Sequence, residues 1–241
     1  GCILSEGEVV LKNPPYFTDV SNMCAILEKL GMKVLRQDNA LVINGESANP
    51  KFVPVEIAKL LRSSIFTLGA MLGRFKRARV AYPGGCDIGL RPIDLHLKGL
   101  RDMGVVITEN HGVINCDATK FHGGLVHLDF PSVGATENLI MTAVLGKCKT
   151  TILNCAREPE VVDLCNFLNK MGARIFGAGT GKLEIEGVDR LCGTEYTPIG
   201  DRIIAGTYLI ASTITGGEIE VCGCNPMFFA SLIDKLRYSG C

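Results

Sequence analysis

Residues 159–172 read PEVVDLCNFLNKMG, and the same pattern returns in residues 92–104 (PIDLHLKGLRDMG) and 226–240 (PMFFASLIDKLRYSG). Each run has an opening proline, apolar residues three or four apart and a closing glycine. The opening prolines are 67 residues apart at both steps, and the closing glycines are 68 apart. Proline suits the first position of a helix and glycine the left-handed position just after its end. The runs therefore predict three helices, each with one buried face. A looser copy runs from Pro14 to Gly31.

The rest of each copy also repeats. Two short β-patterned runs follow the closing glycine, at 105–107 and 113–116 and again at 174–176 and 183–186. A second helix is predicted at 63–73, 135–146 and 203–214, each followed by a strand at 78–82, 150–153 and 218–221. These two helices and three strands account for all but one strand of a βαβαββ unit, and repeated units of this kind predict a layered α/β domain. The first copy keeps only residues 2–5 of its first helix and the fourth stops before its hairpin, so both ends look truncated relative to the pattern.

Composition limits the classes of function. The 241 residues include 47% hydrophobic side chains, with 25 acidic and 25 basic residues, which is typical of a soluble globular protein. Zero net charge gives no bulk attraction to nucleic acid or to anionic lipid, so an anionic ligand would need a few placed cations. There is no signal-peptide pattern and no apolar run long enough to span a bilayer, and the sequence predicts a cytoplasmic protein.

The cysteines predict no disulfide framework. There are eleven, an odd number, without a C-x-x-C motif, and most lie in apolar patterns such as those around Cys24, Cys116 and Cys165. We expect reduced, mostly buried thiols. Cys222 and Cys224 could form half of a metal site, but no second cluster accompanies them, so no metal is predicted.

One copy carries an insertion that the scaffold does not need. From the last strand residue to the helix-opening proline there are five or six steps in three copies, but ten from Tyr82 to Pro92. The extra stretch, residues 83–91 (PGGCDIGLR), has three glycines that permit close approach to a ligand. Cys86 could act as a general acid, and Arg91 is a permanent cation next to a helix start that favours phosphate. A surface loop with an incidental thiol remains the alternative.

Residues 83–96 (PGGCDIGLRPIDLH) closely resemble the catalytic-loop signature of the UDP-N-acetylglucosamine 1-carboxyvinyltransferases, which are enolpyruvyl transferases. The match extends in order to residues 61–65, 132–136, 156–163 and 201–203. The resemblance implies an inside-out α/β barrel domain built from βαβαββ units. It places an N-terminally truncated first domain, with the cysteine loop, at residues 1–199 and the truncated start of a second, similar domain at residues 200–241.

The resemblance also implies roles for individual residues. Cys86 corresponds to the proton donor to the methylene carbon of phosphoenolpyruvate; that sulfur can form a covalent adduct with this substrate and is alkylated by fosfomycin. Arg91 corresponds to a contact with phosphoenolpyruvate and with the UDP-sugar. Residues matching the uridine-binding run and further nucleotide-sugar contacts are Pro92, Ile93, Asp94 and Leu95, then Arg62, Ser132, Val133 and Gly134. Phe130 and Pro131 replace a polar, often basic stretch of the family, which weakens the match beside Ser132.

The implied reaction is transfer of the enolpyruvyl group of phosphoenolpyruvate to the 3′-hydroxyl of UDP-N-acetylglucosamine, with release of phosphate. This is the first committed step of peptidoglycan biosynthesis, and it needs no metal or organic cofactor. By the resemblance, a Lys-Asn pair of the family precedes residue 1, and an aspartate general base and a further arginine follow Cys241. The polypeptide alone is therefore expected to lack turnover.

Other interpretations stay open. The related 3-phosphoshikimate 1-carboxyvinyltransferase shares the fold and donor but lacks the PGGC loop, and a non-catalytic nucleotide-sugar-binding paralogue would look the same in sequence. Asp94 and His96 could be ordinary residues of a first helical turn. Residues 177–182 (GAGTGK) suggest a phosphate-binding loop, but a hairpin turn is favoured because a strand follows them. The oligomeric state is not predicted.

Overall fold

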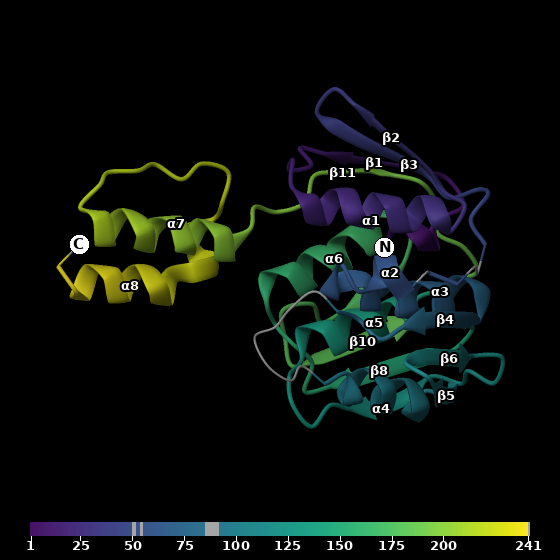
Figure 1. The fold of residues 1–241 in the computed structure, drawn as a ribbon. Helices are drawn as coiled ribbons and strands as arrows, with labels where there is room; N and C mark the ends of the chain where they lie inside the picture. Colours follow the sequence, from purple (N-terminus) through teal and green to yellow (C-terminus); the bar gives the residue numbers. More distant parts are fainter. Residues whose placement is uncertain (50–51, 54, 85–91, 241) are drawn as a thin grey trace. The chain divides into compact units, whose positions relative to one another are not determined.

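The chain forms two compact units, Gly1–Thr197 and Pro198–Cys241, which are described separately. The computed structural model describes residues 1–49, 52–53, 55–84 and 92–240 (Figure 1). The first unit contains all the strands of the described chain, in three sheets, and the second contains helices α7 and α8.

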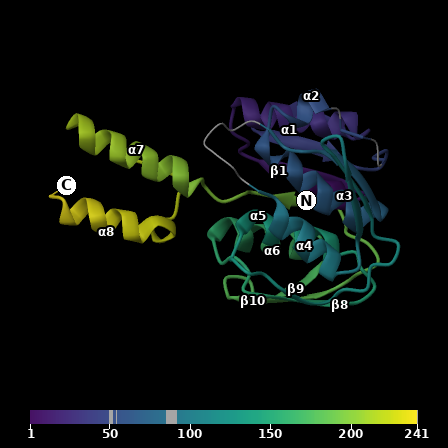
Figure 2. The ribbon, with the colours of Figure 1, turned by 60° about the horizontal axis from the view of Figure 1, so that its bottom comes forward.

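One copy of the repeat is complete and has the predicted βαβαββ order. A four-stranded sheet of order β7-β8-β10-β9 holds its strands, with β7 parallel to β8 and the other neighbours antiparallel. Figure 2 shows α5 and α6 on one face of this sheet. Its elements are β7 (Gly124–His127), α5 (Val133–Ala143), β8 (Lys149–Leu153), α6 (Pro159–Lys170), β9 (Arg174–Phe176) and β10 (Lys182–Glu186).

Two further copies follow the same order in part. The three-stranded sheet β4-β6-β5 and the four-stranded sheet β11-β1-β3-β2 each pair a hairpin with the strand that precedes its helix. The middle copy consists of α2 (Val55–Ala58), η2 (Arg62–Ile65), α3 (Phe66–Phe75), β4 (Arg77–Ala81), α4 (Asp94–Asp102), β5 (Val106–Asn110) and β6 (Val113–Asp117). The first consists of η1 (Cys2–Leu4), β1 (Glu8–Lys12), α1 (Thr18–Lys29), β2 (Lys33–Gln37) and β3 (Ala40–Asn44), with β11 (Glu195–Tyr196) parallel to β1.

Helices α3 and α5 form the centre of the first unit. Most of their residues are buried, whereas each sheet has an exposed face. The two helices approach closely because Gly69 and Gly73 of α3 face the backbone of α5, at Asn138 and Met141. Burying apolar helices inside surrounding sheets gives the inside-out α/β arrangement that the resemblance implied.

The predicted helix ends are largely confirmed. Gly31, Gly104, Gly172 and Gly240 all have positive φ angles, as residues that follow a helix in the left-handed conformation do. Pro159 occupies the first turn of α6. Pro92 differs, because Ile93 is the N-cap of α4, so this proline lies before the helix and not at its first position. Residues 177–181 form the turn of the β9–β10 hairpin and Lys182 begins β10, so the expected hairpin turn is confirmed.

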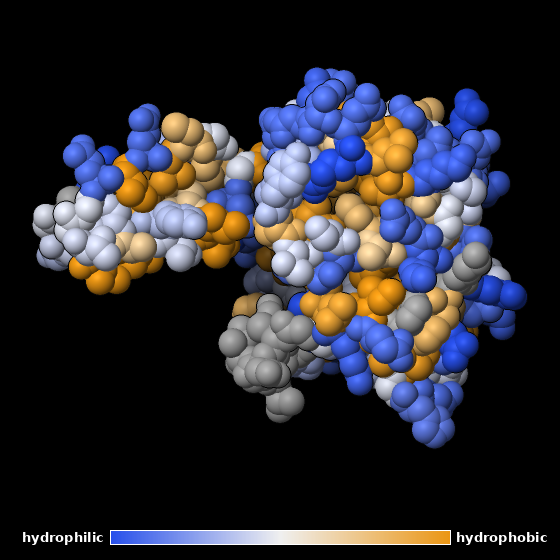
Figure 3. All heavy atoms as spheres, turned by 45° about the horizontal axis from the view of Figure 1, so that its top comes forward, coloured by the Kyte–Doolittle hydropathy of each residue, from blue (hydrophilic) through white to orange (hydrophobic). Residues whose placement is uncertain are grey.

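The second unit comprises α7 (Arg202–Thr215), η3 (Pro226–Phe229) and α8 (Ala230–Tyr238). The strand predicted at 218–221 is wrong: these residues have no strand structure, since they pair with no other described segment and a strand needs a ladder partner. Within the helices of this unit, only Ala205 and Gly206 are buried. Figure 3 shows apolar side chains on its surface. Exposed apolar residues of α7 are Ile203, Ile204, Tyr208, Ile210 and Ile214.

The cysteine prediction is correct in one respect and wrong in another. The nine cysteines in the described chain are all free thiols, but only Cys2, Cys116, Cys155 and Cys165 are buried. Surface loops such as that around Cys222 account for part of the difference. In the described ranges there is no group of His, Cys, Asp or Glu side chains suited to a metal ion, and no helix is long and apolar enough to cross a membrane.

Candidate functional site

A pocket of about 660 Å³ lies where the start of α5 meets η2, α3 and the N-terminal end of α4. Four segments that are far apart in the sequence supply its walls. Its lining residues are Asp19, Leu60, Leu61, Arg62, Ser63, Ile65, Phe66, Pro92, His96, Ser132, Val133 and Gly134. This pocket, the Arg62 pocket, therefore brings together five of the predicted site residues: Arg62, Pro92, Ser132, Val133 and Gly134.

The start of α5 presents backbone donors to this pocket. Ser132 is the N-cap, and its side-chain oxygen accepts a hydrogen bond from the backbone N–H of Ala135 over 3.3 Å. The N–H groups of Val133 and Gly134 make no hydrogen bond to any described residue. Unpaired N–H groups and the positive end of the helix dipole favour an anion here.

The cationic side of the pocket comes from Arg62, the first residue of η2, which is half-buried. Its charge lies close enough to His96 to affect that side chain. Burial, followed by the positive charge of Arg62, lowers the pKa of His96 to about 4. The imidazole is therefore neutral near pH 7, and the positive charge on this wall is that of Arg62.

Ile93, Asp94 and Leu95 line a second hollow, of about 490 Å³, which shares Pro92 with the first pocket. Four of the five charged side chains that line it form ion pairs, and Asp94 is the fifth. Lys98 binds Asp129 with a 2.7 Å contact, and Arg101 binds Glu109 over 3.0 Å. The run from Pro92 to Leu95 thus separates two hollows, and only its first residue borders the pocket with Arg62.

Cys86 and Arg91, the two residues with the strongest chemical prediction, lie outside the described residues. Their predicted roles stay predictions. The described chain resumes at Pro92, on the rim of the Arg62 pocket.

Residues 2–241 match the EPSP synthase (3-phosphoshikimate 1-carboxyvinyltransferase) family. The chain belongs to the EPSP synthase family.

Relatives within this group carry a more specific name. The chain is 49% identical to UDP-N-acetylglucosamine 1-carboxyvinyltransferase 2 of Caldanaerobacter subterraneus subsp. tengcongensis, over 99% of this chain and 57% of that protein. It is 43% identical to UDP-N-acetylglucosamine 1-carboxyvinyltransferase 1 of Clostridium perfringens, over 100% of this chain and 58% of that protein. The chain thus spans a little more than half the length of these relatives.

Solved structures of enolpyruvyl transferases share the fold. The enolpyruvyl transferase NikO from Streptomyces tendae superposes with a TM-score of 0.76 at 19% identity, over 88% of this chain and 50% of that one. EPSP synthase from Acinetobacter baumannii gives a TM-score of 0.66 at 17% identity, over 88% and 48%. These structural likenesses confirm the predicted α/β fold class of this EPSP synthase family member.

His96 and Asn138 were not among the predicted site residues of this EPSP synthase family chain. His96 lines the pocket, yet in the sequence it looks like an ordinary residue of the first turn of α4. Asn138 lies in an apolar helix, and its bond to His96 joins residues 42 positions apart. A buried asparagine among apolar neighbours is the one sequence signal that could have drawn attention to it.

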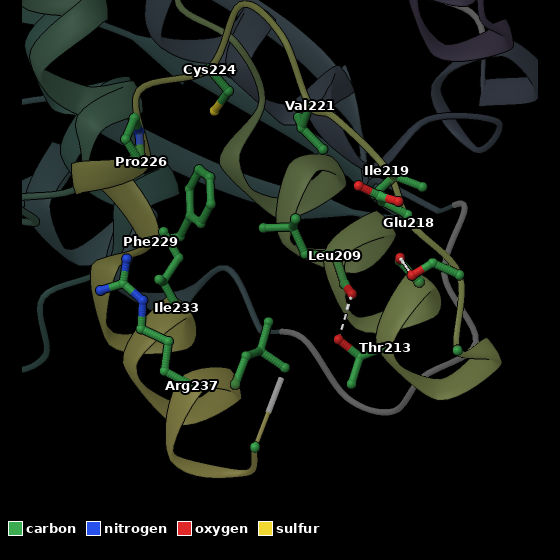
Figure 4. A pocket seen from close by; sticks show the side chains of 15 residues that line it. Leu209, Thr213, Glu218, Ile219, Val221, Cys224, Pro226, Phe229, Ile233 and Arg237 are labelled. Carbon is green, nitrogen blue, oxygen red and sulfur yellow. Dashed lines mark hydrogen bonds between the residues drawn. The ribbon is translucent and has the colours of Figure 1, made fainter.

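The second unit has a hollow of its own, of about 760 Å³. Figure 4 shows Leu209, Phe229 and Ile233 among the apolar side chains that surround it, with Arg237 at one side. No residue predicted to bind substrate lines this hollow. The candidate site of the EPSP synthase family chain is therefore the Arg62 pocket of the first unit.

Proposed function

We propose that the protein transfers the enolpyruvyl group of phosphoenolpyruvate to the 3′-hydroxyl of UDP-N-acetylglucosamine and releases phosphate. This reaction is the first committed step of peptidoglycan biosynthesis, and we place it in the cytoplasm. The observation that carries the proposal is the convergence of Arg62, Pro92 and the start of α5 on one pocket. Each of these three segments had been matched separately to a nucleotide-sugar contact. The names of the relatives at 43% and 49% identity support the choice of acceptor.

The pocket suits the diphosphate of the nucleotide sugar. Arg62 supplies a permanent positive charge, and the N–H groups of Val133 and Gly134 supply two directed donors at a helix start. We assign the uridine to the run from Pro92 to Leu95, on the basis of the family resemblance.

The chemistry is an addition followed by an elimination. The sugar hydroxyl oxygen bonds to carbon 2 of phosphoenolpyruvate and gives up its proton to a base, while Cys86 gives a proton to carbon 3. The resulting ketal then loses a proton from carbon 3 and expels phosphate, which restores the double bond. Arg91 and neighbouring arginines neutralise the carboxylate and phosphate, so this proposal needs no metal or organic cofactor.

We assign the first unit to the first enolpyruvyl transferase domain and the second unit to the start of a second, similar domain. The sequence-based boundary lies between residues 199 and 200. Cys86 falls within the first of these domains, together with the Arg62 pocket.

Calorimetric titration tests the acceptor. We expect the protein to bind UDP-N-acetylglucosamine and not 3-phosphoshikimate, and Arg62→Leu to weaken this binding by roughly tenfold or more, as loss of a charge-assisted contact does. Arg190→Leu, at an exposed position, is the matched control and should leave the affinity unchanged. Binding of 3-phosphoshikimate alone would favour the shikimate enzyme. Binding of neither ligand would contradict the proposed acceptor. Phosphate release is not the readout, because this polypeptide alone is expected to lack turnover.

Labelling with fosfomycin tests the proposed role of Cys86. In the presence of UDP-N-acetylglucosamine, mass spectrometry should find one adduct, on the peptide that contains Cys86. Because the chain has eleven cysteines, adducts spread over several of them would indicate nonspecific reactivity and count against the assignment.

A further inference from the structure

Two polar side chains are buried beside the pocket, one on α4 and one on α5. His96 exposes 6% of its surface and Asn138 none. Burying a polar group is costly unless it is hydrogen-bonded, so the partners of these two side chains determine how each is oriented. The two form a connected network with the backbone of η2 and α3.

Two backbone groups orient the amide of Asn138. Its Oδ1 accepts a hydrogen bond from the N–H of Gly69 over 2.8 Å, and its Nδ2 donates to the carbonyl oxygen of Ile65 over 3.2 Å. The reversed amide would set its NH₂ against an N–H group and its oxygen against a carbonyl. The nitrogen and oxygen of this side chain are therefore assigned by their partners.

This orientation determines the tautomer of His96. The second hydrogen of Asn138 Nδ2 is directed at His96 Nδ1, 2.8 Å away. Nδ1 must then accept, so it carries no proton. Since burial and the nearby Arg62 charge lower the pKa of His96 to about 4, the ring is neutral and its single proton is on Nε2.

The Nε2 edge of the ring lies next to the start of α5. A Cβ atom added to Gly134 would lie 3.1 Å from His96 Cε1 and 3.2 Å from Nε2. His96 and Gly134 both line the Arg62 pocket. Nε2 makes no hydrogen bond within the described chain, and neither do the N–H groups of Val133 and Gly134. Three donors without an acceptor thus gather at one wall.

We propose that Asn138 is a positioning residue that holds His96 in its Nε2–H tautomer, so that His96 donates a hydrogen bond, beside the Val133 and Gly134 amides, to a phosphate oxygen of a nucleoside diphosphate. The nature of this ligand rests on the proposed function. A neutral donor is suited to this wall because it adds a directed contact without a second buried positive charge next to Arg62.

The tautomer is tested directly by long-range ¹H–¹⁵N NMR on protein labelled at histidine. The sequence has only four histidines, and the signals of His96 are those missing from His96→Gln. We expect a protonated Nε2 and an unprotonated Nδ1 at pH 7, and a mixture of tautomers in Asn138→Leu. A proton on Nδ1 in the wild type would overturn the proposal, and this holds even if Asn138→Leu fails to fold.

The ligand contact is tested by ligand-observed NMR with UDP and with uridine, which lacks phosphate. His96→Phe should weaken binding of UDP roughly 10- to 100-fold, the loss of a hydrogen bond to a charged group, and leave uridine nearly unaffected. His127→Phe, at an exposed position of β7, should change neither. Equal losses for UDP and uridine would indicate a structural role only and overturn the contact.

Failure of the proposed function gives a different result. If the wild type shows the Nε2–H tautomer but binds neither UDP nor UDP-N-acetylglucosamine, the positioning by Asn138 stands and the assigned ligand is wrong. If the wild type binds both but carries its proton on Nδ1, the proposed function stands and the positioning is wrong.

Discussion

The side-chain oxygen of Asn138 on α5 accepts a hydrogen bond from the backbone N–H of Gly69 on α3, and the backbones of the two helices also lie close together at this point. A backbone N–H inside a helix normally bonds only within its own helix. Here the absence of a Cβ on Gly69 lets the asparagine reach it. The contact joins the two central helices and also orients the side chain that positions His96.

Substitution of Gly69 by alanine should destabilise the protein. The new Cβ would lie 2.4 Å from the backbone oxygen of Asn138 and 2.5 Å from its Oδ1, so one helix would have to move. We expect a loss of about 1–3 kcal/mol in the free energy of unfolding, measured by urea denaturation, despite the better helix propensity of alanine.

Gly99→Ala is the matched control for this prediction. Gly99 also lies in a helix that faces α5, but its Cβ would meet the methyl groups of Leu139, 2.7 and 2.9 Å away, which can rotate aside. A smaller loss is expected. Equal effects of the two substitutions would show that the close backbone approach at Gly69 is not a main source of stability.

Lys76 should stabilise the ends of both central helices. Its ammonium group donates to the carbonyl oxygens of Gly73 and Leu145 over 2.8 and 2.9 Å. Lys76→Met leaves both carbonyls without this donor, and we expect it to lower the free energy of unfolding by about 1–3 kcal/mol. Lys147→Met removes an exposed lysine and should cost less than about 0.5 kcal/mol in the same urea titration. A loss at Lys147 as large as at Lys76 would contradict the assignment.

The repeat could be predicted from the sequence because it depends on local signals. Prolines before helices, glycines after them and alternating hairpin strands all act within a few residues, and three copies reinforce one another. The strand at 218–221 fails for a different reason. Its residues are β-prone, but a strand also needs a partner, and the described chain supplies none there.

The candidate site was predictable in part. Arg62 and the start of α5 could be matched because their motifs are contiguous in sequence. The bond between His96 and Asn138 could not, because it depends on how α4 packs against α5 and on the two backbone groups that turn the amide. A polar residue in an apolar helix indicates that a partner exists without saying which one.

Glu137 on α5 should make the protein less stable as the pH rises. Burial, followed by the negative charge of Glu160, raises the pKa of this carboxyl to about 7. The folded state then binds a proton that the unfolded state has released above about pH 4.5, so stability falls between about pH 4.5 and 7. The loss in the free energy of unfolding is roughly 3 kcal/mol by pH 8.

Urea denaturation at several pH values tests this. Glu137→Gln should remove the fall in the free energy of unfolding, whereas Glu46→Gln, at an exposed position, should not. An unchanged pH profile for Glu137→Gln would contradict the prediction.

His96 should have the opposite pH dependence. Its folded pKa of about 4 lies below the usual 6.5, so the unfolded state binds a proton first, and stability falls as the pH drops from about 6.5 towards 4. The difference corresponds to roughly 3 kcal/mol. Because Glu137 gains stability over much of the same range, the two effects offset each other in the wild type. The clear comparison is therefore Glu137→Gln with and without His96→Gln. The free energy of unfolding of Glu137→Gln should fall below pH 6.5, and that of the double variant should fall much less. Parallel pH profiles would show that the pKa of His96 in the folded protein is close to its usual value of 6.5.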